Sequence, residues 1–169
     1  DGSKQPPVSA VARLAKLMNV RLLERPHAGP AAARNAGASE ARGELLAFTD
    51  DDCQPEPDWL MGLVREASLG PPRAVGGWTV NALDASAFSE ASQLLVDYLY
   101  SYFNVDPSRA TFLTSNNMLV PRAEFERLGG FDETFPLAAA EDRDFCARWV
   151  SEGHEMVLTR EARIHHFHG

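Results

Sequence analysis

Segments with apolar residues at helical spacing alternate along this chain with short, continuous apolar runs. Apolar positions three or four residues apart indicate a helix with one buried face, whereas a short apolar run between turn residues indicates a buried strand. The pattern predicts helices at residues 8–18, from Pro30 onward, and at 60–67, 87–103, 124–128 and from about 141. It predicts strands at residues 20–23, 44–49, 74–80, 118–120, 156–159 and 162–167.

Alternation of strands and helices favours a sheet covered by helices, because a crossover helix returns the chain to the edge where the previous strand began. We therefore expect an α/β domain with a mostly parallel central sheet. A chain of 169 residues is long enough to bury a core of its own. In the longest predicted helix, 87–103, we expect most of the aromatic side chains to pack in that core.

The formal net charge of −8 argues against nucleic acid as a main partner, because the phosphate backbone attracts an excess of Lys and Arg. This negative charge is compatible with a small phosphate-containing ligand that binds through a divalent cation. The two cysteines, Cys53 and Cys146, form no Cys-x-x-Cys pair, and this favours a reducing compartment. We expect a cytoplasmic protein, with peripheral attachment to the inner face of the membrane as an alternative.

Three aspartates, Asp50, Asp51 and Asp52, follow directly on the strand predicted at 44–49. In open α/β sheets, ligands bind beyond the carboxyl ends of the strands. Adjacent carboxylates repel one another, and a divalent cation that also holds substrate phosphates removes that cost. Asp50 and Asp52 are separated by one residue and can bind the same ion. A solvated acidic turn that opens the next helix is the alternative.

Glu141 and Asp142 form an acidic pair at the predicted start of a helix. The pair either stabilises the positive end of the helix dipole or supplies a general base that takes a proton from an attacking hydroxyl.

Three histidines lie near the end of the sequence. On a strand, His166 and His168 share one face, and His165 lies on the other. A neutral imidazole is a good further ligand for a metal such as Mn²⁺. A mobile terminus or a tag remnant is the alternative for these histidines.

Several stretches, taken together, carry a family resemblance. Residues 28–37 (AGPAAARNAG) and 42–55 (RGELLAFTDDDCQP) resemble the family 2 glycosyltransferases. Further along, the order and spacing of residues 115–118 (SNNM), 128–135 (LGGFDETF) and the pair Glu141-Asp142 are also similar to that family. The resemblance spans nearly the whole chain. It implies one catalytic domain over residues 1–169 with the GT-A fold, a Rossmann-like three-layer α/β/α sandwich.

The resemblance implies a metal and diphosphate site. Asp50 and Asp52 match the family's D-x-D element, which binds the divalent cation, Mn²⁺ or Mg²⁺, and the donor diphosphate. Asp52 is the more direct metal ligand, and Asp51 is assigned with this element to donor binding. His166 matches the histidine that can complete the metal site, and Asp142 matches the catalytic base of the inverting members.

The remaining candidates concern the nucleotide and the sugars. Asp1 and Ser3 match the end of an Asp-Asp-Gly-Ser turn whose aspartate meets the base or the ribose. Arg34 matches an arginine that helps to hold the nucleotide, and its neighbour Asn35 is assigned with it; a helix-surface arginine is the alternative. Acceptor or donor-sugar contacts are assigned to three residues: Trp78, Asn117 and Glu141.

The implied reaction is an inverting displacement in which an acceptor hydroxyl attacks a nucleoside-diphosphate sugar. A uridine diphosphate sugar is the commonest donor in the family, and the acceptor is a saccharide, a lipid-linked or another hydroxyl compound, with a homo-oligomer as a further option. Residues 136–140 are expected to form a lid over the donor. The chain begins inside the Asp-Asp-Gly-Ser turn. A first βα unit is therefore expected to be missing, leaving an open slot in the sheet.

Two other functions are compatible with parts of the pattern. A metal-dependent nucleotidyltransferase has a related architecture, but its glycine-rich signature lies in a first strand and loop that this sequence does not show. A degenerate GT-A domain that only binds is expected to have lost metal or base carboxylates, all of which are present. A zinc protein built from the C-terminal histidines and Cys53 or Cys146 fits no standard spacing.

Overall fold

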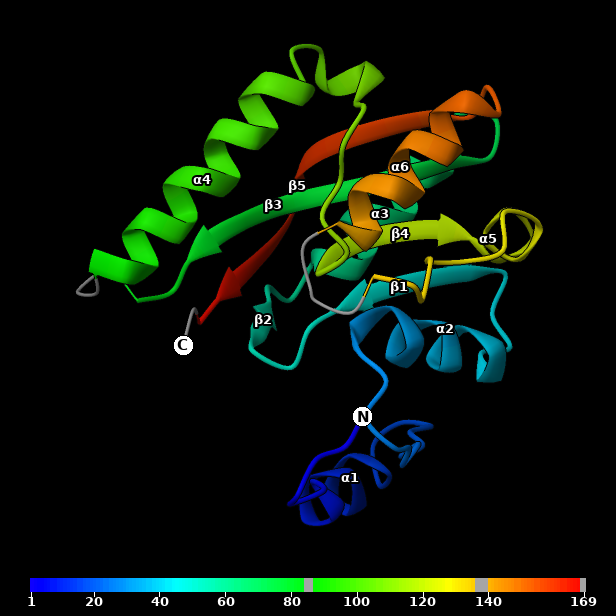
Figure 1. The fold of residues 1–169 in the computed structure, drawn as a ribbon, viewed down its shortest axis with the longest axis vertical. Helices are drawn as coiled ribbons and strands as arrows, with labels where there is room; N and C mark the ends of the chain where they lie inside the picture. The colour runs from blue at the N-terminus through cyan, green and yellow to red at the C-terminus, as the bar shows by residue number, and fades with distance from the viewer. Residues whose placement is uncertain (84–86, 136–139, 168–169) are drawn as a thin grey trace.

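The computed structural model describes residues 1–83, 87–135 and 140–167, which fold around a five-stranded mixed sheet (Figure 1). The strands lie side by side in the order β1 (Leu45–Thr49), β4 (Asn117–Pro121), β3 (Arg73–Asn81), β5 (Glu155–His166) and β2 (Cys53–Pro55). Of the pairings among the described strands, only that of β3 with β5 is parallel.

The expectation of a mostly parallel sheet is therefore wrong, and the path between β3 and β4 shows why. Helix α4 (Ala87–Phe103) follows β3, and the short helix η1 (Pro107–Arg109) comes after it. The chain then lies over the sheet: the Ala110 N–H donates to the carbonyl of Met156 at 2.9 Å, and Leu113 lies against Gly76. Strand β4 consequently starts partway along β3 and runs in the opposite direction.

Helices cover both faces of the sheet, so the three-layer α/β/α architecture is confirmed (Figure 1). Helices α4 and α6 (Glu141–Ser151) lie on one face, and α3 (Trp59–Ala67) lies on the other. Strand β4 packs against the helices on both faces of the sheet. Met118 and Val120 belong to the larger core cluster, and Leu119 belongs to the cluster under α3. This alternation is the period of two that a strand imposes on its side chains. Helices α1 (Val8–Leu14), α2 (Pro30–Glu40) and α5 (Arg122–Arg127) complete the described elements.

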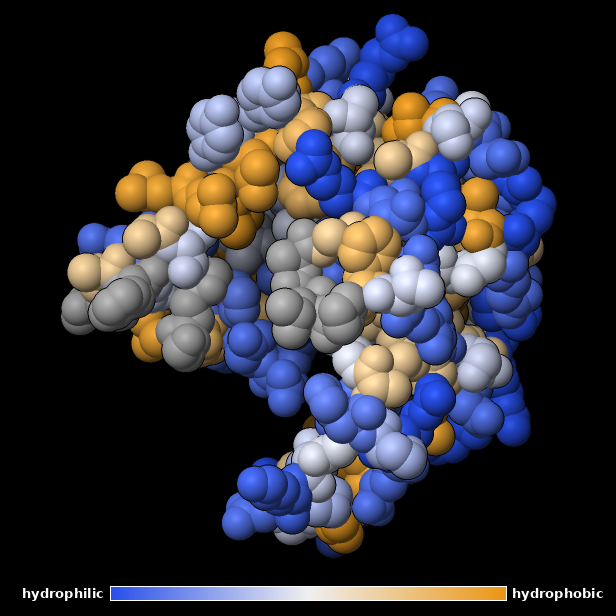
Figure 2. All heavy atoms as spheres, viewed as in Figure 1, coloured by the Kyte–Doolittle hydropathy of each residue, from blue (hydrophilic) through white to orange (hydrophobic). Residues whose placement is uncertain are grey.

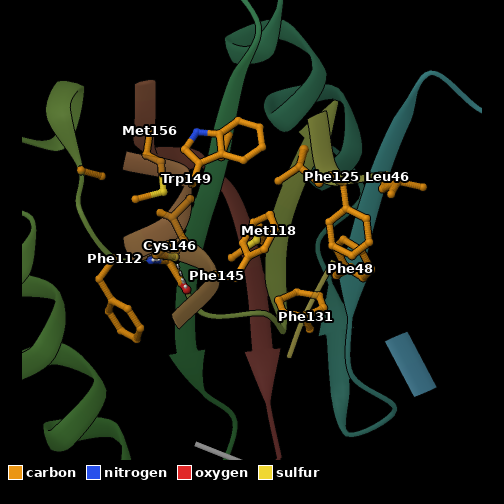
Figure 3. Close-up of a cluster of buried hydrophobic side chains, with 14 of the residues drawn as sticks. Leu46, Phe48, Phe112, Met118, Phe125, Phe131, Phe145, Cys146, Trp149 and Met156 are labelled. Atoms are coloured by element: carbon orange, nitrogen blue, oxygen red, sulfur yellow. Dashed lines mark hydrogen bonds between the residues drawn. The ribbon is translucent and has the colours of Figure 1, made fainter. Parts of the chain in front are cut away.

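A chain of aromatic rings forms the centre of the larger cluster (Figure 3). Phe48 of β1 contacts Phe131, Phe131 contacts Phe145 of α6, and Phe145 contacts Trp149, with ring centroids 5.0–5.8 Å apart. Fully burying a side chain of this kind contributes about 1.5–3 kcal/mol. The cluster thus fixes the end of β1 against the start of α6, the two places where the acidic motifs lie.

Two further expectations about local structure are corrected. Residues 20–23 form no strand, because none of the described strands lies beside them to take up their backbone hydrogen bonds. Among the described aromatic and aliphatic side chains of α4, Tyr100 is buried, and Val96, Leu99 and Phe103 are partly buried against the core. Tyr98 and Tyr102 are 62% and 63% exposed, and Leu94 and Leu95 of the same helix are exposed as well. Figure 2 shows a hydrophobic surface where α4 lies.

The outer edge of β1 is unpaired within the described sheet, and a groove of about 530 Å³ runs between it and α2. The groove is lined largely by apolar residues of these two elements and ends at Asp50 and Asp51. The sequence predicts an open slot in the sheet, and the described strands are continuous, with the groove along the edge strand β1. No helix in the described ranges is both long and apolar enough to cross a membrane.

Gly77 of β3 gives a test of how tightly the sheet centre is packed. A methyl group at this position would approach the Ala162 carbonyl and the Asn117 side-chain amide to less than 3.0 Å. We expect Gly77→Ala to lower the free energy of unfolding by about 1–3 kcal/mol, the usual cost of overpacking. Chemical denaturation measures it. Gly37→Ala is the matched control: its Cβ meets nothing within 4 Å, and a helical Gly-to-Ala change should stabilise by about 0.5–1 kcal/mol. Equal stability of both variants would contradict the packing at Gly77.

Candidate active site

The first part of the site lies where β1 turns into β2. Asp50, Asp51 and Asp52 follow the last residue of β1, and the Cys53 N–H donates to the carbonyl of Asp50 at 3.2 Å, which closes the turn. Strand β2 then pairs with the end of β5, so that Cys53 lies directly opposite His166. The Phe167 N–H donates to the Asp52 carbonyl at 2.9 Å and extends this pairing by one step.

This pairing gathers three potential metal ligands. Asp52 Oδ2 lies 3.0 Å from His166 Nε2, and Asp52 Oδ1 lies 3.6 Å from Cys53 Sγ. One ligand atom from each residue falls within 4.8 Å of the others, and Asp52 is half exposed. Carboxylate and imidazole are a donor set that suits Mn²⁺, so these residues fit a divalent cation. Burial, together with the negative charge of Asp52, raises the pKa of the Cys53 thiol to about 12.

The second part of the site is an ion-pair network around Arg34 of α2. Its guanidinium donates to Asp50 Oδ1 at 2.6 Å and to Glu141 Oε1 at 2.9 Å. The side chains of Arg34 and Glu141 are only 14% and 3% exposed. A buried carboxylate needs a partner of opposite charge, because desolvation disfavours its ionised form. Arg34 therefore links the turn after β1 to the start of α6.

Asp142 follows Glu141 at the start of α6 and faces the same region. Its Oδ2 accepts a hydrogen bond from the Ser115 N–H at 3.4 Å, and its Oδ1 accepts one from the Arg143 N–H at 2.7 Å. Burial, and next the negative charge of Glu141, raise the pKa of Asp142. A carboxyl group with a raised pKa is a stronger base when ionised, which is what proton removal from a hydroxyl requires.

Two of the predicted nucleotide residues have structural contacts of their own. The carboxylate of Asp1 accepts hydrogen bonds from the N–H groups of Ala28 and Gly29, both at 2.9 Å, just before α2 begins. Asn35 donates to the Phe131 carbonyl at 2.8 Å and accepts from the Phe131 N–H at 2.9 Å. Asn35 thus holds α2 to the turn that precedes α6 rather than pointing toward Asp50. Ser3 and Asp51 are exposed.

Two predicted sugar contacts lie apart from the acidic network. Asn117 is fully buried and accepts a hydrogen bond from Trp59 Nε1 at 2.7 Å, so its side chain is not on the surface. Trp78 lines a separate cavity of about 520 Å³ beside α4, where the guanidinium of Arg160 lies 4.8 Å from its ring centroid. Among the described residues, the structure brings together Arg34, Asp50, Glu141 and Asp142, and separately Asp52 and His166.

The sequence offers Cys53 only in the disfavoured zinc alternative with the C-terminal histidines, and it does not place this residue beside Asp52. The position of Cys53 depends on β2, a three-residue strand that contains a proline and gives no strand signal in the sequence. Most of the predicted lid (residues 136–139) and His168 lie outside the described residues.

Comparison with known families and proteins points to one family. Residues 1–129 match the model of glycosyl transferase family 2. Over 157 residues the chain is 30% identical to the pre-mycofactocin glycosyltransferase of Mycobacterium tuberculosis, covering 89% of this chain and 33% of the relative. It is 27% identical over 143 residues to the glucosyl-dolichyl phosphate glucuronosyltransferase of Haloferax volcanii, covering 79% of this chain and 46% of that protein. The chain thus spans one third to less than one half of these relatives.

Two solved structures share the fold. The mannosyltransferase PcManGT from Pyrobaculum calidifontis, in complex with GDP-Man and Mn²⁺, superposes with a TM-score of 0.68 at 22% identity, over 97% of this chain and 44% of that chain. GalNAc-T7, with UDP, GalNAc and Mn²⁺, superposes with a TM-score of 0.65 at 14% identity, over 86% of this chain and 31% of that chain. At these identities the likeness establishes the GT-A fold.

Removal of Arg34 should destabilise the domain strongly. In Arg34→Ala the carboxylate of Glu141 keeps its buried position but loses its counter-charge, and breaking a buried pair in this way costs about 3–5 kcal/mol. Arg65→Ala is the matched control, because the Arg65–Glu161 pair is exposed and such pairs contribute about 0–1 kcal/mol. Denaturant unfolding of both variants measures the difference. Similar losses in the two variants would refute a buried network around Arg34.

The raised pKa of Asp142 predicts a pH-dependent gain in stability on its removal. A carboxyl group whose folded pKa exceeds its unfolded value stabilises the fold when protonated and loses that contribution as pH rises through the folded pKa. Asp142→Asn, which resembles the protonated form, should therefore raise Tm at neutral pH, and the gain should vanish below the unfolded pKa of about 3.9. Thermal unfolding across this range measures it. Asp144→Asn, which loses its ion pair with Arg148, should show no such gain.

Proposed function

The chain belongs to glycosyl transferase family 2, and on that premise we propose that it transfers a sugar from a nucleoside-diphosphate donor to an acceptor hydroxyl, with inversion at the anomeric carbon. The bridging contacts of Arg34 are the observation that carries this proposal, because they bring Asp50 and the Glu141-Asp142 pair to one place from 91 residues apart in the sequence (141 less 50). The alternative interpretations, a solvated acidic turn and an acidic pair that only stabilises the helix dipole, require no ion pairs that join the two motifs.

In this proposal Asp52 and His166 would hold a divalent cation, and the donor diphosphate would bind beside them. A bound cation supplies positive charge to the diphosphate as it leaves. Arg34 adds a fixed positive charge next to Asp50, close to the same turn, although much of that charge is engaged by two carboxylates. Mn²⁺ is present in the complexes of both similar structures, and this supports a divalent cation for this chain.

The acceptor hydroxyl loses its proton to Asp142. The Ser115 and Arg143 N–H groups hold the carboxylate in place, and Glu141 next to it raises its affinity for a proton. Glu141 itself is held by Arg34 and is buried, so it positions the start of α6 rather than meeting the acceptor. The deprotonated oxygen then attacks the anomeric carbon as the bond to the diphosphate breaks, and this single displacement inverts the configuration.

Donor and acceptor identities follow from similarity alone. One similar structure holds a uridine nucleotide and the other a guanosine diphosphate sugar, so both nucleotides are candidates here. The name of the Haloferax volcanii relative specifies a lipid-phosphate sugar as its acceptor, which makes a lipid-linked saccharide one acceptor class to test. The family match favours this proposal over a nucleotidyltransferase, and the presence of Asp52, Asp142 and His166 favours it over a degenerate binding domain.

Two substitutions should separate donor binding from chemistry. Asp52→Ala should lower the affinity for UDP or GDP in the presence of Mn²⁺ at least about tenfold, since changes even around metal ligands cost 10–100-fold. Asp142→Asn should leave that affinity within about threefold but lower the transfer rate, or the slower hydrolysis of the donor, by about 10²–10⁴-fold. Calorimetry with and without chelator measures binding, and release of the nucleoside diphosphate measures turnover.

Matched controls remove the same charge nearby. Asp58→Ala changes an exposed aspartate that makes no capping hydrogen bond at the start of α3, and it should preserve diphosphate binding. Asp144→Asn lies in the same first turn of α6 as Asp142 and should keep near-normal turnover. An affinity for the diphosphate that changes neither with chelator nor in Asp52→Ala would rule out the proposed metal site. Full turnover in Asp142→Asn would rule out the proposed base.

A further inference from the structure

Cys53 lies beside the two residues proposed to hold the cation, and the proposed reaction does not use it. Its thiol is half buried, and its backbone pairs directly with that of His166. Residues directly opposite each other in an antiparallel pair present their side chains on the same face, with Cβ atoms about 4.5–5.5 Å apart. The β2–β5 pairing therefore aims the sulfur of Cys53 and the imidazole of His166 toward the same side of the sheet.

The carboxylate of Asp52 lies between these two groups. One oxygen is 3.0 Å from His166 Nε2, and the other is 3.6 Å from Cys53 Sγ. All three ligand atoms lie within 4.8 Å of one another. Ligand atoms around a tetrahedral Zn²⁺ lie about 2.0–2.3 Å from the ion, so the three side chains would draw closer together around one. The hydrogen bond from the Phe167 N–H to the Asp52 carbonyl holds the turn in this arrangement.

The chemistry of the sulfur decides which ions such a site prefers. Carboxylate and imidazole ligands alone accept Mn²⁺ readily, and Mg²⁺ favours oxygen ligands. A thiolate ligand instead favours softer ions such as Zn²⁺ and Co²⁺. Three protein ligands also leave one position of a tetrahedral ion open, as catalytic zinc sites do.

We propose that Cys53 is the third protein ligand of the cation, so that Asp52, Cys53 and His166 select Zn²⁺ or Co²⁺ over Mg²⁺ and leave one position open to a diphosphate oxygen. Metal binding through sulfur replaces the thiol proton, which is released to solvent. The inference deepens the proposed function, on which it rests for the role of the cation. Other nearby groups fit less well: His165 pairs with Glu56 on the opposite side of β5, and Cys146 is buried in the core.

The test uses Co²⁺ as a spectroscopic probe of the metal-free protein. Coordination by a thiolate gives a sulfur-to-cobalt charge-transfer band in the near ultraviolet, which oxygen and nitrogen ligands do not give. We expect this band in the unmodified protein and in Cys146→Ala, and its loss in Cys53→Ser. Circular dichroism checks that each variant is folded. His165→Ala should keep the band, whereas His166→Ala should weaken Co²⁺ binding.

Affinities for Zn²⁺ and Mn²⁺ give a second, independent readout. Oxygen and nitrogen sites also bind Zn²⁺ more tightly than Mn²⁺, so the affinity ratio in the unmodified protein is not diagnostic by itself. The change in that ratio on substitution is diagnostic. Cys53→Ser should weaken Zn²⁺ binding at least about tenfold and Mn²⁺ binding less than about threefold. Competition titrations against a metal indicator measure both constants.

The outcomes separate this inference from the proposed function. A Co²⁺ complex of the folded protein without the charge-transfer band, no binding of Co²⁺ at all, or an unchanged Zn²⁺ to Mn²⁺ ratio in Cys53→Ser would each overturn the role of Cys53. Diphosphate binding that depends on Mn²⁺ and Asp52 would still support the proposed function in those cases. Conversely, a cobalt–thiolate band in a protein that binds no nucleoside diphosphate would support the metal site and count against glycosyl transfer.

Discussion

The ion pair between Arg34 and the buried Glu141 is the constraint on which the arrangement of the site depends. Glu141 is 3% exposed, and a carboxylate at that depth stays ionised only beside a positive charge. Because the same guanidinium reaches Asp50, the requirement to neutralise one buried charge fixes helix α2, the end of β1 and the start of α6 relative to one another. The aromatic cluster beneath them supplies the apolar packing that makes the pair buried in the first place. The position of the Glu141-Asp142 pair and the position of the turn at Asp50 thus both depend on the contacts of Arg34.

The other half of the site depends on a different kind of contact. Asp52 and His166 meet because a three-residue edge strand, β2, pairs with the last residues of β5. Three backbone pairs hold this part, together with one hydrogen bond beyond each end of the pairing, from Phe167 N–H to Asp52 and from Glu56 N–H to Arg163. Asp52 is half exposed. Short edge pairings of this kind open more readily than buried core strands. The proposed base is therefore held beside a buried network, whereas the proposed metal ligands, Asp52 and His166, lie at the edge of the sheet.

The sequence predicts most elements of the fold and the two acidic motifs, and it fails where long-range pairing decides. Apolar periodicity is local, so it places α3, α6, β1 and β4 within a few residues of their observed bounds. It cannot show that residues 104–116 fold back over the sheet, and this return makes β4 antiparallel. It also cannot show which side of α4 faces the sheet, since apolar residues occur on more than one side of that helix. Local spacing argues against Cys53 as a zinc ligand for the same reason: its partner, His166, lies 113 residues further along the chain (166 less 53).

Three adjacent aspartates are expected to repel one another strongly, and the structure shows how the chain tolerates them. Their side chains diverge: Asp50 pairs with Arg34, Asp51 is exposed to water, and Asp52 contacts the imidazole of His166. Each carboxylate thus has its own means of stabilisation, and only Asp52 combines exposure with neighbouring ligand atoms. Repulsion between the three charges consequently does not by itself demand a cation shared by Asp50 and Asp52. The aspartates of the D-x-D element therefore have different contacts: Asp50 belongs to the network around Arg34 that reaches the start of α6, and Asp52 is the one of the pair that the proposed function assigns to the cation.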